Sequence, residues 1–281
     1  MNKRLLNNLL SNQGLILYSL LVIGFLSVEV QAQEGDSIYK FQYQFPNPVQ
    51  SFTTDQLQQC YLVTPQNEVI KYNNAGNIQF RFNNNRLGEL AFVDATDPFN
   101  LLLYYPEFLT VILLDRTLSQ TGEYNLYDLD VVEVKALGLS NDNNLWIYDD
   151  VSFKVKKINQ QNGETLVQSD DLSLVLGLTI QPNFIIERQN WVFVNDPNIG
   201  VLQFDLFGQY VKTLDINGLE QFQIHDNRLI YQKEGQLFAF HLESLNTQKI
   251  PLPEKVKGKI QVQKNRMYVQ TGEELRVYSY K

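Results

Sequence analysis

Cysteine and histidine are almost absent from this sequence. Its 281 residues include one cysteine, Cys60, and two histidines, His225 and His241. A single cysteine cannot form a disulfide within the chain, and these three residues cannot supply the four ligands of a zinc site built from Cys and His alone. Cys60 stands in an apolar run, so it is expected to be a small buried residue.

Catalytic signatures and clustered positive charge are also missing. The chain has no Gly-x-Ser-x-Gly elbow, no glycine-rich phosphate loop and no His-Glu-x-x-His motif. Its 23 Lys and Arg against 31 Asp and Glu give a net charge of −8. Nucleic acid is therefore not expected as a partner, because binding phosphates requires grouped basic residues. The nearest basic group, residues 255–259, is short and is expected to be a solvated loop.

The N-terminus has the pattern of a secretory signal peptide. Lys3 and Arg4 precede an apolar run over residues 15–28, and small residues before Gln33 form a cleavage site. We expect residues 1–32 to be the signal peptide and residues 33–281 the mature domain, with a retained membrane anchor as the alternative. No later segment is apolar and long enough to span a bilayer. The predicted location is the periplasm or outer surface of a Gram-negative bacterium.

What the sequence does contain is a repeat. An apolar strand-like run recurs about every 37 to 47 residues, a spacing typical of propeller blades. The runs are rich in aromatic and β-branched residues and are separated by Asn, Asp and Gly turns, which indicates strands. Aligned copies predict an all-β chain forming a six-bladed β-propeller with four antiparallel strands per blade, five and seven blades being the alternatives. The recurring runs are residues 60–64, 101–105, 145–148, 191–194, 229–231 and 267–269.

The two ends of the repeat region are complementary. The chain stops just after the third strand of the last unit, while an unassigned strand, residues 38–45, precedes the first unit. We expect this N-terminal strand to complete the last blade and so close the ring, which removes the exposed edges that an open sheet would have.

One repeat resembles a known family. Residues 204–214, Phe-Asp-Leu-Phe-Gly-Gln-Tyr-Val-Lys-Thr-Leu, are similar to the strand–turn–strand signature of NHL-type six-bladed propellers, and residues 71–78 are similar in a weaker form. The resemblance implies the fold. It does not select a function, because such propellers include binding scaffolds, sensor domains and metal-dependent enzymes.

Loops between second and third strands should all emerge on one face of the ring, and each carries acid. We interpret this acidic face as a candidate binding surface for a cationic partner or a hard cation, the alternative being ordinary exposed turns. Asp94 and Asp97 are a separate weak calcium candidate, although a stiffened turn needs no metal. The residues of the acidic face are Glu68, Glu107, Asp149, Asp150, Asp196, Glu234 and Glu273.

Tyr105 and Phe108 flank one of these loops. Core packing is the favoured interpretation of these residues, and an exposed aromatic contact for a partner is the alternative.

From these patterns we expect an exported, non-enzymatic propeller, a monomer that acts as a protein-interaction scaffold in the bacterial envelope. No cofactor is predicted, with calcium as the alternative. Two other functions stay open, so the sequence does not decide whether the chain is an enzyme. One is a metal-dependent hydrolase or lyase with its site at the central channel, and the other is a sugar- or peptide-binding module using the central depression.

Overall fold

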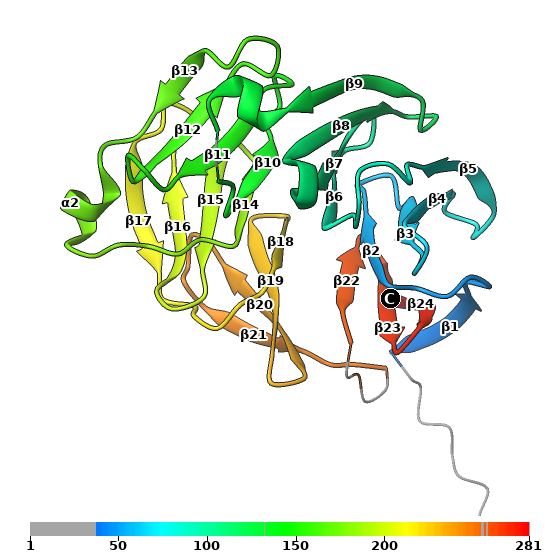
Figure 1. Ribbon diagram of the computed structural model, residues 1–281. Helices are drawn as coiled ribbons and strands as arrows, with labels where there is room; N and C mark the ends of the chain where they lie inside the picture. The colour runs from blue at the N-terminus through cyan, green and yellow to red at the C-terminus, as the bar shows by residue number, and fades with distance from the viewer. Residues whose placement is uncertain (1–37, 132, 254–255, 257, 281) are drawn as a thin grey trace, which may run out of the picture. The chain divides into compact units, whose positions relative to one another are not determined.

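The computed structural model describes residues 38–131, 133–253, 256 and 258–280. These residues form a ring of six four-stranded antiparallel sheets, which confirms the predicted six-bladed β-propeller (Figure 1). The predicted signal peptide, residues 1–32, lies outside the described residues. No helix in the described ranges is both long and apolar enough to cross a membrane.

Each blade runs from an innermost strand at the channel to an outermost strand at the rim. Blade 1 consists of β2 (Ser51–Thr54), β3 (Cys60–Val63), β4 (Glu68–Tyr72) and β5 (Ile78–Asn83). Blade 2 consists of β6 (Phe92–Asp97), β7 (Asn100–Tyr105), β8 (Thr110–Asp115) and β9 (Gln120–Asn125). Blade 3 consists of β10 (Leu137–Leu139), β11 (Leu145–Asp149), β12 (Lys154–Ile158) and β13 (Thr165–Gln168).

Blades 4 to 6 follow the same order. Blade 4 consists of β14 (Phe184–Arg188), β15 (Trp191–Asp196), β16 (Gly200–Phe204) and β17 (Tyr210–Leu214). Blade 5 consists of β18 (Phe222–His225), β19 (Arg228–Lys233), β20 (Gln236–His241) and β21 (Thr247–Ile250). Blade 6 consists of β22 (Ile260–Gln263), β23 (Arg266–Thr271) and β24 (Glu274–Tyr280), and β1 (Tyr39–Gln44) completes it.

The closing strand is the predicted one. β1 pairs antiparallel with β24, from Tyr39 opposite Tyr280 to Gln44 opposite Arg276. Edge-to-face ring contacts support the pairing, with Phe41 and Tyr278 at a centroid distance of 5.8 Å. The last blade is thus built from both ends of the described chain.

Second strands read as unbroken apolar runs because both faces of each blade are buried. In β7, Leu101 and Leu103 pack with Tyr61 of blade 1, whereas Leu102 between them packs with Leu145 of blade 3. Alternate residues of one strand therefore belong to two different cores, one on each side of the blade.

Innermost strands present one unpaired edge to the channel, and side chains from neighbouring blades cap part of it. Asp94 Oδ2 accepts a hydrogen bond of 3.0 Å from the backbone N–H of Leu139. Gln223 Oε1 accepts one of 2.8 Å from the N–H of Val262. These bonds join blade 2 to blade 3 and blade 5 to blade 6, and they satisfy donors that would otherwise lie open at a sheet edge.

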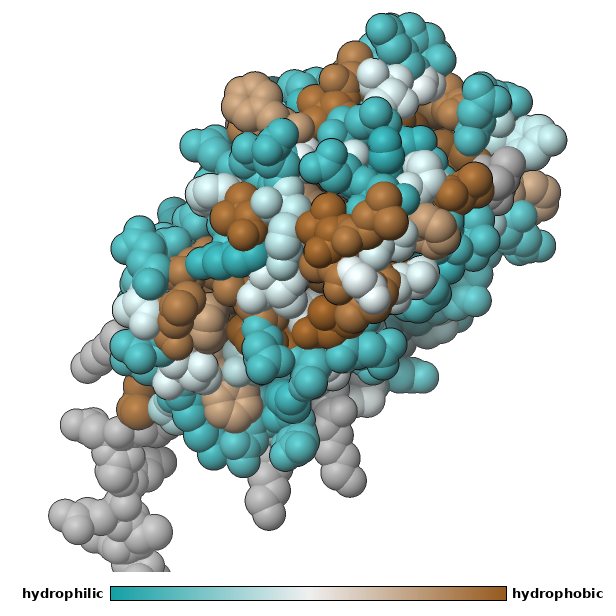
Figure 2. Space-filling view, turned by 90° about the vertical axis from the view of Figure 1, so that its left-hand side faces the viewer, coloured by the Kyte–Doolittle hydropathy of each residue, from teal (hydrophilic) through white to brown (hydrophobic). Residues whose placement is uncertain are grey.

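Among the residues that the structure describes, helical structure is confined to connections. Two 3₁₀ turns, Pro106–Phe108 and Leu126–Leu129, and the short helix α2 (Leu172–Leu176) link strands. Asp171 caps α2 by accepting the N–H of Ser173. The helix and the residues after it leave Leu174, Val175 and Leu178 exposed. α2 lies at the left of Figure 1, and Figure 2, which looks onto that side, shows apolar side chains among polar ones on the surface.

The aromatic pair beside the 3₁₀ turn Pro106–Phe108 divides between core and surface. Tyr105 is fully buried, as the favoured interpretation of core packing predicted. Phe108, in the 3₁₀ turn itself, is 49% exposed.

Candidate functional site

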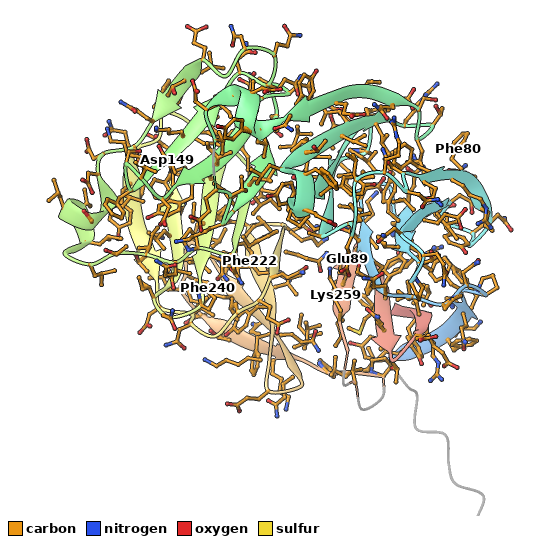
Figure 3. The ribbon with its side chains drawn as sticks, in the orientation of Figure 1. Phe80, Glu89, Asp149, Phe222, Phe240 and Lys259 are labelled. Carbon is orange, nitrogen blue, oxygen red and sulfur yellow. The ribbon has the colours of Figure 1, made fainter. Side chains whose placement is uncertain are left out.

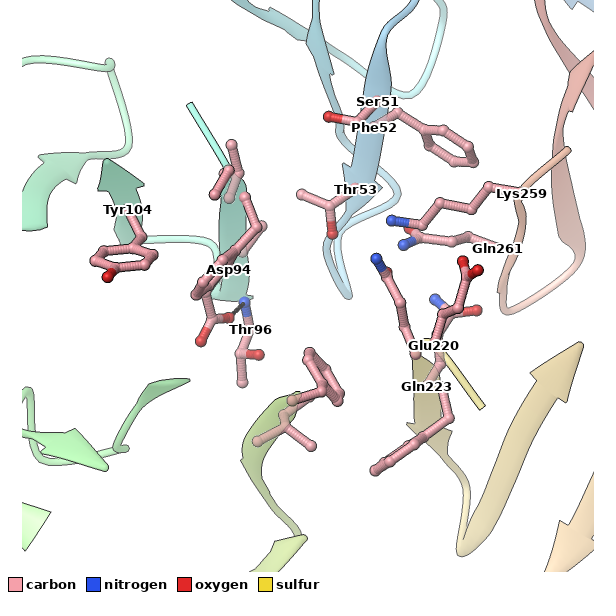
Figure 4. Close-up of a pocket in the computed structure, with 18 of the residues that line it drawn as sticks. Ser51, Phe52, Thr53, Asp94, Thr96, Tyr104, Glu220, Gln223, Lys259 and Gln261 are labelled. Carbon is pink, nitrogen blue, oxygen red and sulfur yellow. Dashed lines mark hydrogen bonds between the residues drawn. The ribbon is translucent and has the colours of Figure 1, made fainter. Parts of the chain in front are cut away.

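A central cavity of about 290 Å³ lies where the innermost strands of all six blades converge (Figure 4). Its lining comes from two chemically different walls. Figure 4 shows Thr53, Lys259 and Gln261 on one side of this space, with Tyr104 on the other side. A ligand there would meet an apolar surface and a polar surface at the same time.

The apolar wall belongs to blades 2 to 5. Phe92 and Tyr104 pack at a centroid distance of 5.8 Å, and Phe184 meets Phe222 edge to face at 5.3 Å. Ile186 of β14 adds an aliphatic surface. Phe92, Phe184 and Ile186 are only partly buried, so apolar area remains available to a ligand.

The polar wall belongs to blades 5, 6 and 1. Gln221 and Gln223 flank the start of β18, and Gln261 and Gln263 lie on β22. Thr54 fixes the second pair, because its hydroxyl donates to Gln261 Oε1 at 2.9 Å and its carbonyl accepts from Gln263 Nε2 at 3.4 Å. This wall therefore offers amide and hydroxyl groups held in place by the ring itself.

Lys259 is the cation of the polar wall. It directly precedes β22, and its backbone carbonyl accepts the N–H of Gln270, which extends the sheet by one residue. Its Nζ lies 5.5 Å from the centroid of the Phe52 ring, and no carboxylate of the described residues lies within 4.0 Å of it. Burial lowers the pKa of the Lys259 ammonium to about 8.

The lining holds two further cations, Lys135, which pairs with Asp150, and Arg188, the last residue of β14 and the second cation without an ion pair among the described residues. Burial lowers the pKa of its guanidinium, and the carboxylates of Asp94, Asp97 and Asp55 raise it in part. None of these carboxylates lies within ion-pair distance, 4.0 Å, among the described residues. Arg188 is thus influenced by acid in blades 1 and 2 without being neutralised by a direct contact.

The two cations mark opposite ends of the channel. All innermost strands run in the same direction, and Lys259 stands before its strand while Arg188 ends its own. A rise of about 3.3 Å per residue separates the two levels by roughly 13 Å over four residues. Figure 3 shows Lys259 and Phe222 on neighbouring innermost elements near the ring centre, with Asp149 away from both.

The predicted acidic face is partly neutralised. Glu68 pairs with Arg81 at 2.7 Å, Asp150 pairs with Lys135 at 2.5 Å, and Asp149 pairs with Lys156. Burial would raise the pKa of Asp149, but hydrogen bonds from Lys156 and Ser152 outweigh this effect and lower it. Exposed pairs of this kind leave less net charge for a partner than the sequence suggests.

The remaining acidic residues fall into two groups. Asp196 is 1% exposed and accepts the backbone N–H groups of Gln181 at 2.5 Å and Asn198 at 2.8 Å. Glu107, Glu234 and Glu273 are exposed, and none has an ion-pair partner among the described residues.

The structure brings only part of the acidic face together. Asp149, Asp150 and Asp196 all act on Tyr148, whose pKa rises to about 12, mainly through burial and then through these charges. None of the residues of the acidic face lines the central cavity. Glu234 lines an adjoining cavity instead. The acidic face therefore stays a prediction, with three exposed carboxylates as its unpaired part.

The two calcium candidates, Asp94 and Asp97, accept hydrogen bonds from backbone N–H groups. Asp94 Oδ1 accepts the N–H of Thr96 at 2.9 Å while its Oδ2 accepts that of Leu139, and Asp97 Oδ1 accepts the N–H of Phe99 at 2.9 Å. Within the described ranges no group of three or more His, Cys, Asp and Glu side chains is arranged to hold a metal. Calcium at these two residues stays a prediction.

Cys60 and the histidines lie apart from the cavity. Cys60 is 1% exposed, as expected, and burial raises the pKa of its thiol. His225 Nε2 lies 3.4 Å from Asp226 Oδ2, and His241 Nδ1 accepts the N–H of Ser244 at 3.3 Å. Neither histidine lines the central cavity.

Sequence reasoning missed the cavity residues. The basic group 255–259 was expected to be a solvated loop, and for Lys259 that expectation was wrong, because its side chain enters the cavity. One signal was available: glutamine alternates with apolar residues at 221–223 and again at 261–263. Two neighbouring innermost strands with the same alternation place four amides together.

No family model and no curated protein sequence matches the chain. Solved structures do match. Virginiamycin B lyase from Staphylococcus aureus is 9% identical with a TM-score of 0.59, over 86% of this chain and 100% of that chain. A catalytically inactive histidine-to-alanine variant of that lyase with quinupristin is 10% identical with a TM-score of 0.58, over the same shares. BamB from Moraxella catarrhalis is 11% identical with a TM-score of 0.48, over 82% of each chain.

The likeness is one of fold. At these identities it supports the six-bladed propeller and assigns no activity to the chain. The finer resemblance to NHL-type repeats stays a prediction.

The predicted non-enzymatic scaffold was wrong. It rested on missing linear motifs, yet structures of the same fold include a lyase. A propeller collects its functional residues from several blades, so missing motifs do not make such a ring non-enzymatic.

Proposed function

We propose that this protein binds a small amphipathic carboxylate in its central cavity. The observation that carries the proposal is Lys259, a cation in a 290 Å³ cavity with no carboxylate of the described residues within 4.0 Å. A partly buried charge without an ion-pair partner is costly, and a ligand carboxylate would replace the hydration that the ammonium has lost. The cavity lies at the small end of ligand pockets, which run from roughly 300 to 1,000 Å³.

The two walls define the rest of the ligand. Its apolar body would pack on Phe92, Phe184 and Ile186, and Gln261 would hydrogen-bond its polar groups. Hydrophobic burial supplies affinity and the polar groups fix orientation.

A single negative charge fits better than several. Asp94 and Glu220 also line the cavity, and they would repel a polyanion such as a diphosphate. A monocarboxylate places its one charge at Lys259 and brings no second charge close to these acids.

The proposal includes where the protein acts. We propose that the protein is exported to the periplasm or outer surface. We also propose that its mature form is a monomeric ring beginning at residue 33, with a protein partner in the envelope. The signal pattern of residues 1–32 supports export.

The test is calorimetric titration with a matched ligand series. Aromatic and branched aliphatic monocarboxylates are compared with their uncharged amides. We expect the carboxylates to bind at least about tenfold more tightly than the amides, and Lys259→Met to remove that difference. Lys249→Met, on exposed outer strand β21, is the matched control and should bind like the wild type. Equal affinity for acids and amides in the wild type would overturn the proposal.

A further inference from the structure

A second cavity of about 540 Å³ lies between blades 5 and 6. We call it the side cavity; its lining includes Gly218, Gln232, Lys233, Glu234, Gly235 and Gly258. It also shares residues with the central cavity: Glu220, Gln221, Phe222, Gln223, Lys259 and Gln261 line both. The two spaces therefore meet at Lys259, the proposed carboxylate-binding residue.

The side cavity is lined by peptide-like groups. The amide of Gln232 bridges the two blades, donating to the carbonyl of Gly258 at 2.7 Å and accepting the N–H of Ile260 at 3.1 Å. Gly218, Gly235 and Gly258 add backbone without side chains to its walls. An extended peptide satisfies its own N–H and C=O groups with amides and backbone of this kind.

Aromatic platforms are scarce in the described lining. Tyr231 is 9% exposed and stacks on Phe238 at 5.4 Å, and Phe222 is 5% exposed. Sugar rings pack their C–H faces on open aromatic surfaces, which neither residue offers. The chemistry favours a peptide over an acidic oligosaccharide.

We infer that the two cavities together bind the C-terminal segment of a peptide with an apolar last residue. The terminal carboxylate lies at Lys259, the last side chain packs on the apolar wall, and the preceding residues run outward through the side cavity. This inference rests on the proposed function, because the same lysine holds the carboxylate. It adds the ligand class and the direction in which the chain leaves the ring.

Gln221 is the position at which a substitution best tests whether a ligand passes from one cavity to the other. It is exposed, lines both cavities and makes no side-chain hydrogen bond within the described residues. Gln221→Trp would therefore narrow the junction without breaking a bond of the ring. Gln248→Trp, on outer strand β21, is its control.

The experiment compares three probes by competition in fluorescence anisotropy: a labelled pentapeptide ending in leucine, N-acetyl-leucine and an oligogalacturonide. We expect the pentapeptide to bind at least about tenfold more tightly than N-acetyl-leucine and to lose most of its affinity when its C-terminus is amidated. Gln221→Trp should weaken the pentapeptide about tenfold and N-acetyl-leucine by less than about twofold.

The outcomes separate the two proposals. If N-acetyl-leucine and the pentapeptide both fail to bind, the proposed carboxylate function is wrong. If N-acetyl-leucine binds and the pentapeptide binds no better, the proposed function stands and the peptide inference is wrong. Tighter binding of the oligogalacturonide than of the pentapeptide overturns the inference in favour of an acidic sugar.

Discussion

The carboxylate of Glu187 accepts a hydrogen bond of 2.5 Å from the indole nitrogen of Trp146 in the preceding blade. Both side chains are buried, at 3% and 0% exposure. The second oxygen of Glu187 accepts the backbone N–H of Asn141 at 3.3 Å. One carboxylate of blade 4 thus satisfies two donors of blade 3, beside the channel that forms the proposed site.

Removing this carboxylate should loosen the ring. Glu187→Ala leaves the indole N–H and a backbone N–H without acceptors, so we expect a loss of about 1–3 kcal/mol for each buried donor. Glu187→Gln keeps an acceptor and should cost less. Urea unfolding of Glu187→Ala, of Trp146→Phe and of the variant with both changes completes a double-mutant cycle, with an expected coupling of about 0.5–3 kcal/mol. Additive effects of the two sites would show that the bond contributes nothing.

Lys259 should make stability and binding depend on pH in opposite senses. Burial lowers its folded pKa to about 8 from an ordinary value of 10.5, so between these values the unfolded chain holds more protons. Stability contributed by this group therefore rises from pH 8 to 10.5, and below pH 8 the full penalty for the buried charge applies.

We accordingly expect Lys259→Met to be more stable than the wild type at pH 7, with the difference shrinking by pH 10. Carboxylate affinity of the wild type should fall as pH rises through 8, because the ammonium loses its charge. Urea unfolding and calorimetry at both pH values measure the two effects. A stability difference that does not change with pH would show that Lys259 is not desolvated.

The closing strand should dominate the stability of blade 6. A chain starting at Phe45 lacks β1, exposes the edge of β24 and loses the packing of Phe41 on Tyr278. We expect a loss on the order of 3 kcal/mol or more from the missing ladder bonds, together with self-association through the open edge. Urea unfolding and gel filtration, with a chain starting at Ser37 as control, check both. Unchanged stability and a monomeric profile would contradict the role of β1.

Asp94 should stabilise the ring with or without calcium. Asp94→Ala removes the acceptor of the Leu139 and Thr96 N–H groups, so a loss of about 1–3 kcal/mol is expected. Because the backbone uses both carboxylate oxygens, melting temperatures should be the same in calcium chloride and in EDTA. A calcium-dependent rise in the wild type that Asp94→Ala abolishes would instead establish the calcium site.

The fold was predictable because strand periodicity is a local property. The apolar runs, the turn residues such as Asn190 and Asn227 at positive φ, and the spare strand before the first blade all follow from short-range chemistry. Phe108 shows the limit of the same reasoning, since core packing was favoured for Tyr105 and Phe108 together, and Tyr105 is buried whereas Phe108 is 49% exposed.

The site was not predictable in the same way. Lys259 and Arg188 are separated by 71 residues in the chain, and both line the channel only because the ring returns to its axis. Their local sequence, a basic group and a tight turn, is typical of solvated surface. Their burial depends on which blades stand opposite, and a single sequence does not encode that in any contiguous motif.

The pairing of Tyr39 with Tyr280 also sets an order of events during synthesis. These residues are separated by 241 positions, so at ribosomal rates of about 5–20 residues per second the first strand is made roughly 12 to 50 s before its partner exists. Until then it is an amphipathic ribbon with no sheet to join. The ring can close only once Tyr280 has been made, so blade 6, with Lys259 at the axis, is the last blade to be completed.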